Sequence, residues 1–221
     1  MEVLQHTLGD RFREFLQEKN FPCVAAKSAS EKGTLKIFVA DHLACPKDDR
    51  AILSFLYEFT EMFRKSTGGF YSAAVMFNSP QNITEEEFER MIWQRLEALH
   101  VLDSAKYTHD TRVNADPSSP EYSFSLMEEA FFIIGLHPQS SRPARQFECP
   151  VLVFNPHAQF DAMKKDQRYE KMKTIVRKRD LAFSGSVNPM LTDFGDVSEA
   201  YQYSGKNYLE DNKCPFILNK K

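Results

Sequence analysis

Two histidines in this chain each follow a run of apolar residues that favour β-strands. His137 comes directly after residues 131–136, and His157 follows residues 151–154 by way of an Asn-Pro pair. Proline stands after His137 and before His157, and it restricts the backbone beside it, so each imidazole starts from a defined geometry. A neutral imidazole at a strand end can ligate a metal or act as a general base near neutral pH. A hydrogen-bonded loop histidine is the structural alternative for both.

Two arginines lie between these histidines. Arg142 and Arg145 are three residues apart and stand beside Ser140 and Ser141. Such a pair can bind a carboxylate or a phosphate in bidentate fashion. A solvated turn is the alternative, and the arginines alone favour it. The basic stretch of residues 160–179 is interpreted as a solvated helix face, because its lysines and arginines alternate with the acidic residues Asp161, Asp166, Glu170 and Asp180.

Composition bounds the class of protein. The chain has 221 residues, is 42% hydrophobic and contains 19 phenylalanines, so it can bury an aromatic core. Its net charge of −3, with acids and bases interleaved, argues against nucleic acid or an anionic membrane surface as the main partner. No apolar run is long enough for a membrane span and no signal pattern begins the chain, so we expect a soluble, cytoplasmic protein. The cysteines lack zinc-type spacing and are expected to be thiols: Cys23, Cys45, Cys149 and Cys214.

The elements that must position these residues follow from hydrophobic periodicity and turn signals. Thr84 and Glu87 form a capping box that begins one helix, and proline after Phe21 ends another. We expect helices over about residues 3–18, 49–67, 85–102 and 160–179, and strands over 35–40, 71–77, 122–126, 130–136 and 151–154. The pattern predicts one α/β domain over residues 1–221, a mixed sheet of about five strands flanked by helices, with an α+β arrangement left open.

The chain loses periodicity after Asp180. The segment that follows is rich in turn formers but also in aromatic residues. A tail of this composition is expected to wrap the domain and cover a site.

Motifs along nearly the whole chain resemble one family in their order. They are Phe21-Pro22-Cys23, Leu99-His100-Val101-Leu102-Asp103, Tyr122-Ser123-Phe124-Ser125, Glu129-Ala130-Phe131-Phe132, Gly135-Leu136-His137-Pro138, Phe154-Asn155-Pro156-His157, Gly185-Ser186-Val187-Asn188-Pro189 and Gln202-Tyr203-Ser204-Gly205. The sequence resembles the YqcI/YcgG family, in particular its branch of heme-dependent guanidine N-hydroxylases. That branch includes the pre-guanitoxin N-hydroxylase and the arginine N-hydroxylase of cycloserine biosynthesis.

The resemblance implies a heme-binding domain and a monooxygenase activity. The cofactor would be heme b, and dioxygen with an electron donor, or peroxide, would supply oxygen to a guanidino nitrogen of arginine or a related small molecule. A heme-binding sensor or carrier without turnover is the alternative, and a third option keeps the fold without the cofactor. A homodimer is one option for the assembly.

The resemblance also suggests which residues hold the iron. His137 is the first choice as the proximal ligand, since proline holds it at a strand end. His157 would be a second ligand or a distal hydrogen-bonding group. Cys23 ranks third, although a thiolate ligand would favour cleavage of the O–O bond.

The remaining assignments concern charges and pocket walls. Arg142 and Arg145 would pair with the heme propionates. A cationic guanidinium needs carboxylates, for which the candidates are Glu129, Asp193 and Glu199. The pocket walls contributed by the C-terminal segment would be Asn188, Gln202 and Tyr203.

Overall fold

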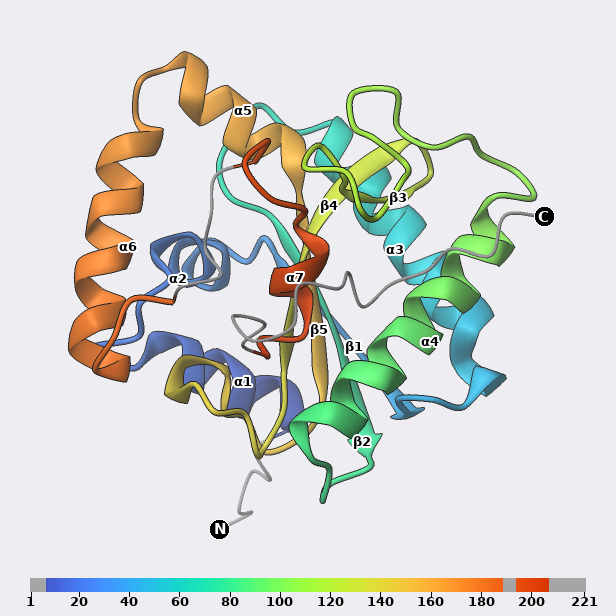
Figure 1. Ribbon diagram of the computed structural model, residues 1–221, viewed down its shortest axis with the longest axis horizontal. Coiled ribbons are helices and arrows are strands. Elements are labelled where there is room, and N and C mark those ends of the chain that lie inside the picture. The colour runs from blue at the N-terminus through green and yellow to red at the C-terminus, as the bar shows by residue number, and fades with distance from the viewer. Residues whose placement is uncertain (1–6, 189–193, 207–221) are drawn as a thin grey trace, which may run out of the picture.

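The computed structural model describes residues 7–188 and 194–206 and centres on a mixed five-stranded sheet (Figure 1). The strand order is β1-β2-β5-β4-β3. β1 (Leu35–His42) and β2 (Ser72–Ser79) are parallel, β5 (Val151–Pro156) runs antiparallel to β2 and to β4 (Glu129–Leu136), and β3 (Phe124–Leu126) is antiparallel to β4. The expected mixed sheet flanked by helices is confirmed.

One face of the sheet packs against α3 (Asp49–Arg64) and α4 (Glu85–Asp103). Alternate strand residues supply this core, as Val75 and Phe77 of β2 do, because successive side chains of a strand point to opposite faces. The predicted capping box begins α4: Thr84 Oγ accepts the Glu87 N–H at 3.2 Å, and the Glu87 carboxylate accepts the Thr84 N–H at 3.0 Å. The apolar side chains packed between this face and the two helices leave no pocket at the strand residues named above.

The other face carries a second core, in which Ala74 and Met76 pack with Phe12 and Leu16 of α1 (Leu8–Gln17). The helix expected over residues 3–18 corresponds to α1, and its first residues lie outside the described chain.

A short helix that the sequence pattern did not predict, α2 (Val24–Glu31), begins directly after Cys23 and packs against α1. Its residues are small and polar and only Ala29 is buried, so no apolar period marked it. Cys23 consequently stands at a helix N-terminus.

The single basic helix expected over residues 160–179 is two helices. α5 (His157–Lys165) follows β5 without a connecting loop, and α6 (Tyr169–Ser184) begins four residues after α5 ends. Gln167 takes a left-handed backbone conformation at φ 58° between them, and the Arg168 N–H donates to the Met163 carbonyl. A break of this kind lacks the usual glycine, which explains why the pattern indicated one continuous helix.

The C-terminal segment returns to the sheet as α7 (Ala200–Tyr203), which packs against β4. β3 pairs only with Glu129–Phe131, so the outer edge of β4 beyond residue 131 has no strand neighbour among the described residues. Tyr203 contacts Phe132 on one side of this edge and Trp93 of α4 on the other. α7 therefore lies along the edge, which confirms the expected wrapping of the domain. No helix within the described residues is long and apolar enough to cross a membrane.

Candidate cofactor pocket

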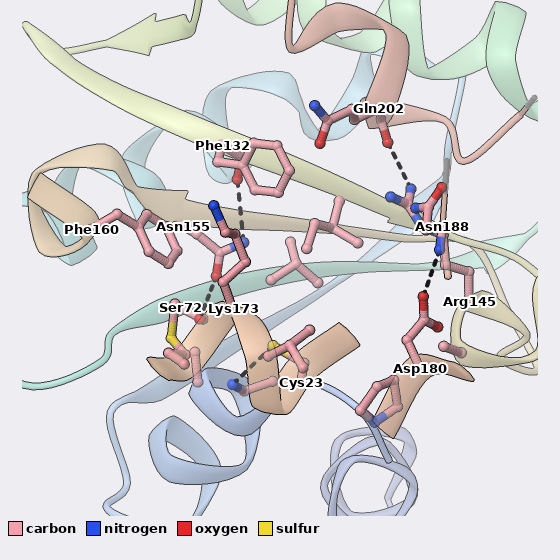
Figure 2. Close-up of a pocket in the computed structure, with 18 of the residues that line it drawn as sticks. Cys23, Ser72, Phe132, Arg145, Asn155, Phe160, Lys173, Asp180, Asn188 and Gln202 are labelled. Carbon is pink, nitrogen blue, oxygen red and sulfur yellow. Dashed lines mark hydrogen bonds between the residues drawn. The ribbon is translucent and has the colours of Figure 1, made fainter. Parts of the chain in front are cut away.

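A pocket of about 260 Å³ opens between the sheet and α6 (Figure 2). Its sheet side is apolar and is formed by Phe132 and Ile134 of β4 and Val153 of β5, all half-buried. These side chains share a face because of the period-two geometry of strands. Met172 and Val176, one turn apart on α6, form the opposite wall. The arrangement suits a flat, largely apolar molecule.

Cys23 lies on a third wall of the pocket, contributed by the N-terminus of α2. Its Sγ accepts the N–H of Ala26 at 3.4 Å (Figure 2). Burial raises the pKa of the thiol, and the backbone N–H groups of Ala25 and Ala26 oppose that effect. Without a bound metal ion the thiol is therefore protonated. A bound metal ion would displace the proton, and the backbone N–H groups would stabilise the resulting thiolate. Cys45 and Cys149 are also free thiols, as predicted, and Cys214 lies outside the described residues.

His157 and Glu199 form a buried pair on the pocket wall. The Nε2 atom of His157 lies 2.8 Å from Glu199 Oε1, and the hydroxyl of Ser123 donates to Glu199 Oε2 at 2.9 Å. A carboxylate only accepts, so Nε2 of His157 carries a proton in this pair. Phe194 packs edge-on against the imidazole, 4.6 Å between ring centroids. Two residues that are 42 positions apart are thus brought together, one at the start of α5 and one directly before α7.

Buried Asp180 pairs with half-buried Arg142 at the other end of the pocket. Arg142 Nη2 donates to Asp180 Oδ2 at 2.8 Å, and the same oxygen accepts the Asn188 N–H at 2.8 Å (Figure 2). The sequence analysis placed Asp180 on a solvated face, and this is wrong, because only 4% of its surface is exposed. Asn188 also lines this pocket.

Arg145 lines the pocket beside this pair and is itself buried. Its Nη1 donates to three carbonyl oxygens, those of Gln202 at 2.8 Å, Tyr203 at 3.3 Å and Gly135 at 3.4 Å. Burial lowers the pKa of Arg145 to about 10, and the charge of Arg142 acts in the same direction. Arg145 is still a cation at neutral pH.

His137 does not line this pocket. It follows β4 with the parity of Gly135 and stacks on Phe88 of α4, with 4.4 Å between the ring centroids, on the opposite face of the sheet. Neither ring nitrogen has a hydrogen-bond partner among the described residues. Burial lowers the pKa of His137 to about 4, so the ring is neutral. The structure therefore separates His137 from the other candidate ligands.

Two further candidates, Glu129 and Tyr203, do not lie where they were expected. Glu129 lies at the start of β4, away from the pocket walls, where its carboxylate is 2.9 Å from Arg112 and 3.5 Å from Arg64. Tyr203 is the last residue of α7, and its side chain is buried in the core, where its hydroxyl accepts the Phe124 N–H at 3.0 Å. The neighbouring Gln202 lines the pocket instead. Asp193 lies outside the described residues.

The sequence analysis missed that one face of α6 lines the pocket. Tyr169, Met172, Val176 and Asp180 repeat at helical spacing and line it together. Their charged neighbours Lys173 and Arg177 also line it, so the basic helix is only partly a solvated face. The helical spacing of these four residues can be read from the sequence, but the alternating charges around them favoured the interpretation as a solvated face. The polar residues Ser72 and Asn155, hydrogen-bonded to each other at 2.7 Å, carried no such signal.

No group of three or more His, Cys, Asp or Glu side chains suited to a metal ion occurs among the described residues. A heme iron needs only one or two axial ligands from the protein. The pocket offers Cys23 and His157 for that purpose.

Comparison with known proteins identifies the family. The sequence model of the YqcI/YcgG family matches residues 12–217, so the chain belongs to this family. It is 27% identical over 231 residues to "Uncharacterized protein YqcI" of Bacillus subtilis (strain 168), a match that covers 98% of this chain and 86% of that protein. No solved structure matches the chain.

Proposed function

We propose that this member of the YqcI/YcgG family is a heme-dependent oxygenase that hydroxylates a guanidino nitrogen of arginine or a related small molecule. The observation that carries the proposal is the position of Cys23, a sulfur donor at a helix N-terminus that faces an apolar pocket. The resemblance of the sequence motifs to guanidine N-hydroxylases supplies the substrate class.

The residues that line the pocket fit a heme. Phe132, Ile134 and Val153 would contact one face of the porphyrin, and Met172 and Val176 would contact the other. Cationic side chains that suit the propionates also line the pocket: Arg142, Arg145, Lys164, Lys173 and Arg177. The donor set suits iron because a cysteine thiolate is an established axial ligand.

Cys23 replaces His137 as the proposed axial ligand. His137 lies on the opposite face of the sheet, against Phe88, whereas Cys23 lies in the pocket. When bound, a heme with a thiolate ligand supplies activation of dioxygen, or of peroxide, for transfer of one oxygen atom.

Side chains of the protein would bind the substrate and accept the proton that it releases. A guanidinium must release a proton before its nitrogen can accept oxygen. Glu199 is buried, and its carboxylate can accept hydrogen bonds from guanidinium N–H groups in addition to those from His157 and Ser123. With Nε2 committed to Glu199, Nδ1 of His157 is the atom that takes up the released proton.

A heme-binding sensor or carrier is the second candidate. One observation favours it: Cys23 and His157 line the same pocket, and two axial ligands would leave no position for oxygen. Against it, His157 Nε2 is held by Glu199 at 2.8 Å.

An optical spectrum of the purified full-length protein tests the proposal. We expect a Soret band, binding of carbon monoxide to the reduced form and a spectral change on addition of arginine. The absence of a Soret band after addition of hemin would refute both heme functions. A Soret band without binding of carbon monoxide would refute the oxygenase and favour the sensor.

Two variants test the ligand. Cys23→Ala is expected to shift the Soret band and weaken heme retention. His137→Phe and Cys45→Ala, which alter residues outside the pocket, should both leave the spectrum unchanged. An unchanged spectrum in Cys23→Ala would refute the thiolate ligand. A changed spectrum in His137→Phe would support His137 as the axial ligand instead.

A further inference from the structure

We infer that Arg145 is the docking point for a carboxylate group of the molecule that occupies the pocket. The inference deepens the proposed function, on which its choice of probe molecules rests. The sequence offered Arg142 and Arg145 together as a site for a carboxylate, and the inference assigns this role to Arg145 alone.

The first observation is that the guanidinium of Arg145 has unused donors. Only 6% of the surface of Arg145 is exposed, yet all the hydrogen bonds of its side chain to described residues leave from Nη1 and go to backbone carbonyls. Nε and Nη2 make no hydrogen bond to a described residue, and no ion pair within residues 7–188 and 194–206 includes Arg145. A guanidinium presents its donors as a planar fork that matches a carboxylate.

The second observation is that the charge of Arg145 is not neutralised. The nearby Asp180 is paired with Arg142 at 2.8 Å and also accepts hydrogen bonds from Asn188 and Ser184. Glu85 also acts electrostatically on Arg145, but its carboxylate accepts hydrogen bonds from Ser141. No carboxylate among the described residues therefore forms an ion pair with Arg145. A buried charge without a counter-ion is costly, and an anionic ligand group would offset that cost.

The third observation is that the surrounding chain is fitted to Arg145. Gly205 has φ 88°, and a Cβ atom at this position would lie 2.8 Å from Cδ of Arg145. The carbonyl of Gln202 accepts a hydrogen bond from Nη1 (Figure 2). The carbonyl of Tyr203 accepts a second one from the same atom. The guanidinium is therefore held in place before any ligand binds, which reduces the entropy cost of docking.

Two sources of carboxylate fit this site, a heme propionate and the α-carboxylate of an amino-acid substrate. Paired probes distinguish them. Hemin is compared with hemin dimethyl ester, which lacks free propionates, and arginine is compared with agmatine, which lacks the carboxylate. Affinities are measured by absorbance titration or calorimetry for the wild type, Arg145→Gln and Arg145→Lys. Arg179→Gln is the matched control, since it removes a partly exposed arginine of α6 that does not line the pocket.

We expect Arg145→Gln to weaken binding of one carboxylate-bearing probe about tenfold or more and to leave its partner without the carboxylate nearly unchanged. Selective loss of hemin identifies the propionate, and selective loss of arginine identifies the substrate carboxylate. Arg145→Lys, which keeps the charge but not the fork, should show a smaller loss of the same probe. Should Arg145→Gln fail to fold, the Arg145→Lys and wild-type titrations decide the question.

The inference is overturned if the variants of Arg145 bind every probe as Arg179→Gln does, or if the wild type discriminates within neither pair. Failure of the wild type to bind either porphyrin refutes the proposed function, while the arginine and agmatine arm still tests Arg145. A wild type that binds hemin but discriminates within neither pair refutes the inference and leaves the proposed function standing. A wild type that binds none of the four probes refutes both.

Discussion

The buried imidazole of His137 should make the folded protein lose stability as the pH falls from 7 to 5. Neither of its nitrogens has a hydrogen-bond partner among the described residues, and it is fully buried against Phe88. Burial lowers the pKa of His137 from the ordinary 6.5 to about 4. Between these two values the unfolded chain binds the proton and the folded chain does not, so acid favours unfolding.

The two pKa values set the size of the effect. At pH 7 both states are mostly neutral at this residue. At pH 5 the imidazole of the unfolded chain is almost fully protonated, while that of the folded chain is about one-tenth protonated. The free energy of unfolding should therefore fall by about 2 kcal/mol between pH 7 and pH 5 from this group alone.

The assay is urea denaturation of the wild type and of His137→Phe at both pH values. Phenylalanine keeps an aromatic ring against Phe88 but cannot titrate, and all other titrating groups are common to the two proteins. We expect the loss of stability from pH 7 to pH 5 to be about 2 kcal/mol smaller in the variant. An equal loss in both proteins would refute the reasoning, since it would mean that His137 takes up its proton in the folded state at the ordinary pH.

Two further predictions concern the charged end of the pocket, and both are measured as free energies of unfolding. Gly205→Ala should destabilise the protein by about 1 kcal/mol more than Gly185→Ala, because both glycines have positive φ but only Gly205 would place a Cβ 2.8 Å from Arg145; equal losses would show that no close contact exists. Asp180→Asn should cost about 3 kcal/mol by leaving the half-buried guanidinium of Arg142 without its partner, and adding Arg142→Gln should recover part of that loss. A double variant that shows purely additive losses would contradict this pairing.

The strands and most of the helices could be predicted, because the apolar residues recur along the chain with the period of a strand or of a helix. The five strands, α1, α3 and α4 follow apolar repeats, and Thr84 with Glu87 marks the start of α4. α2 lacks such a repeat, and the break between α5 and α6 has no glycine or proline, so neither was predicted.

The site was harder to predict, because strand parity says which residues share a face but not which face carries the pocket. His137 and Leu136 are adjacent, yet Leu136 lines the pocket and His137 contacts α4. The tertiary packing of α6 decides between the two faces, and this information lies some forty residues away along the chain. The pairing of His157 with Glu199 depends in the same way on the return of α7 to the sheet.

The position of α7 has a consequence for association between molecules. Beyond residue 131 the outer edge of β4 has no strand neighbour among the described residues, and such an edge can pair with a strand of another chain. α7 covers this edge, and it also brings Glu199 and Gln202 to the pocket. Four residues thus protect the sheet from aggregation and build part of the site. Selection against self-association would preserve α7 even in a relative that had lost its ligand.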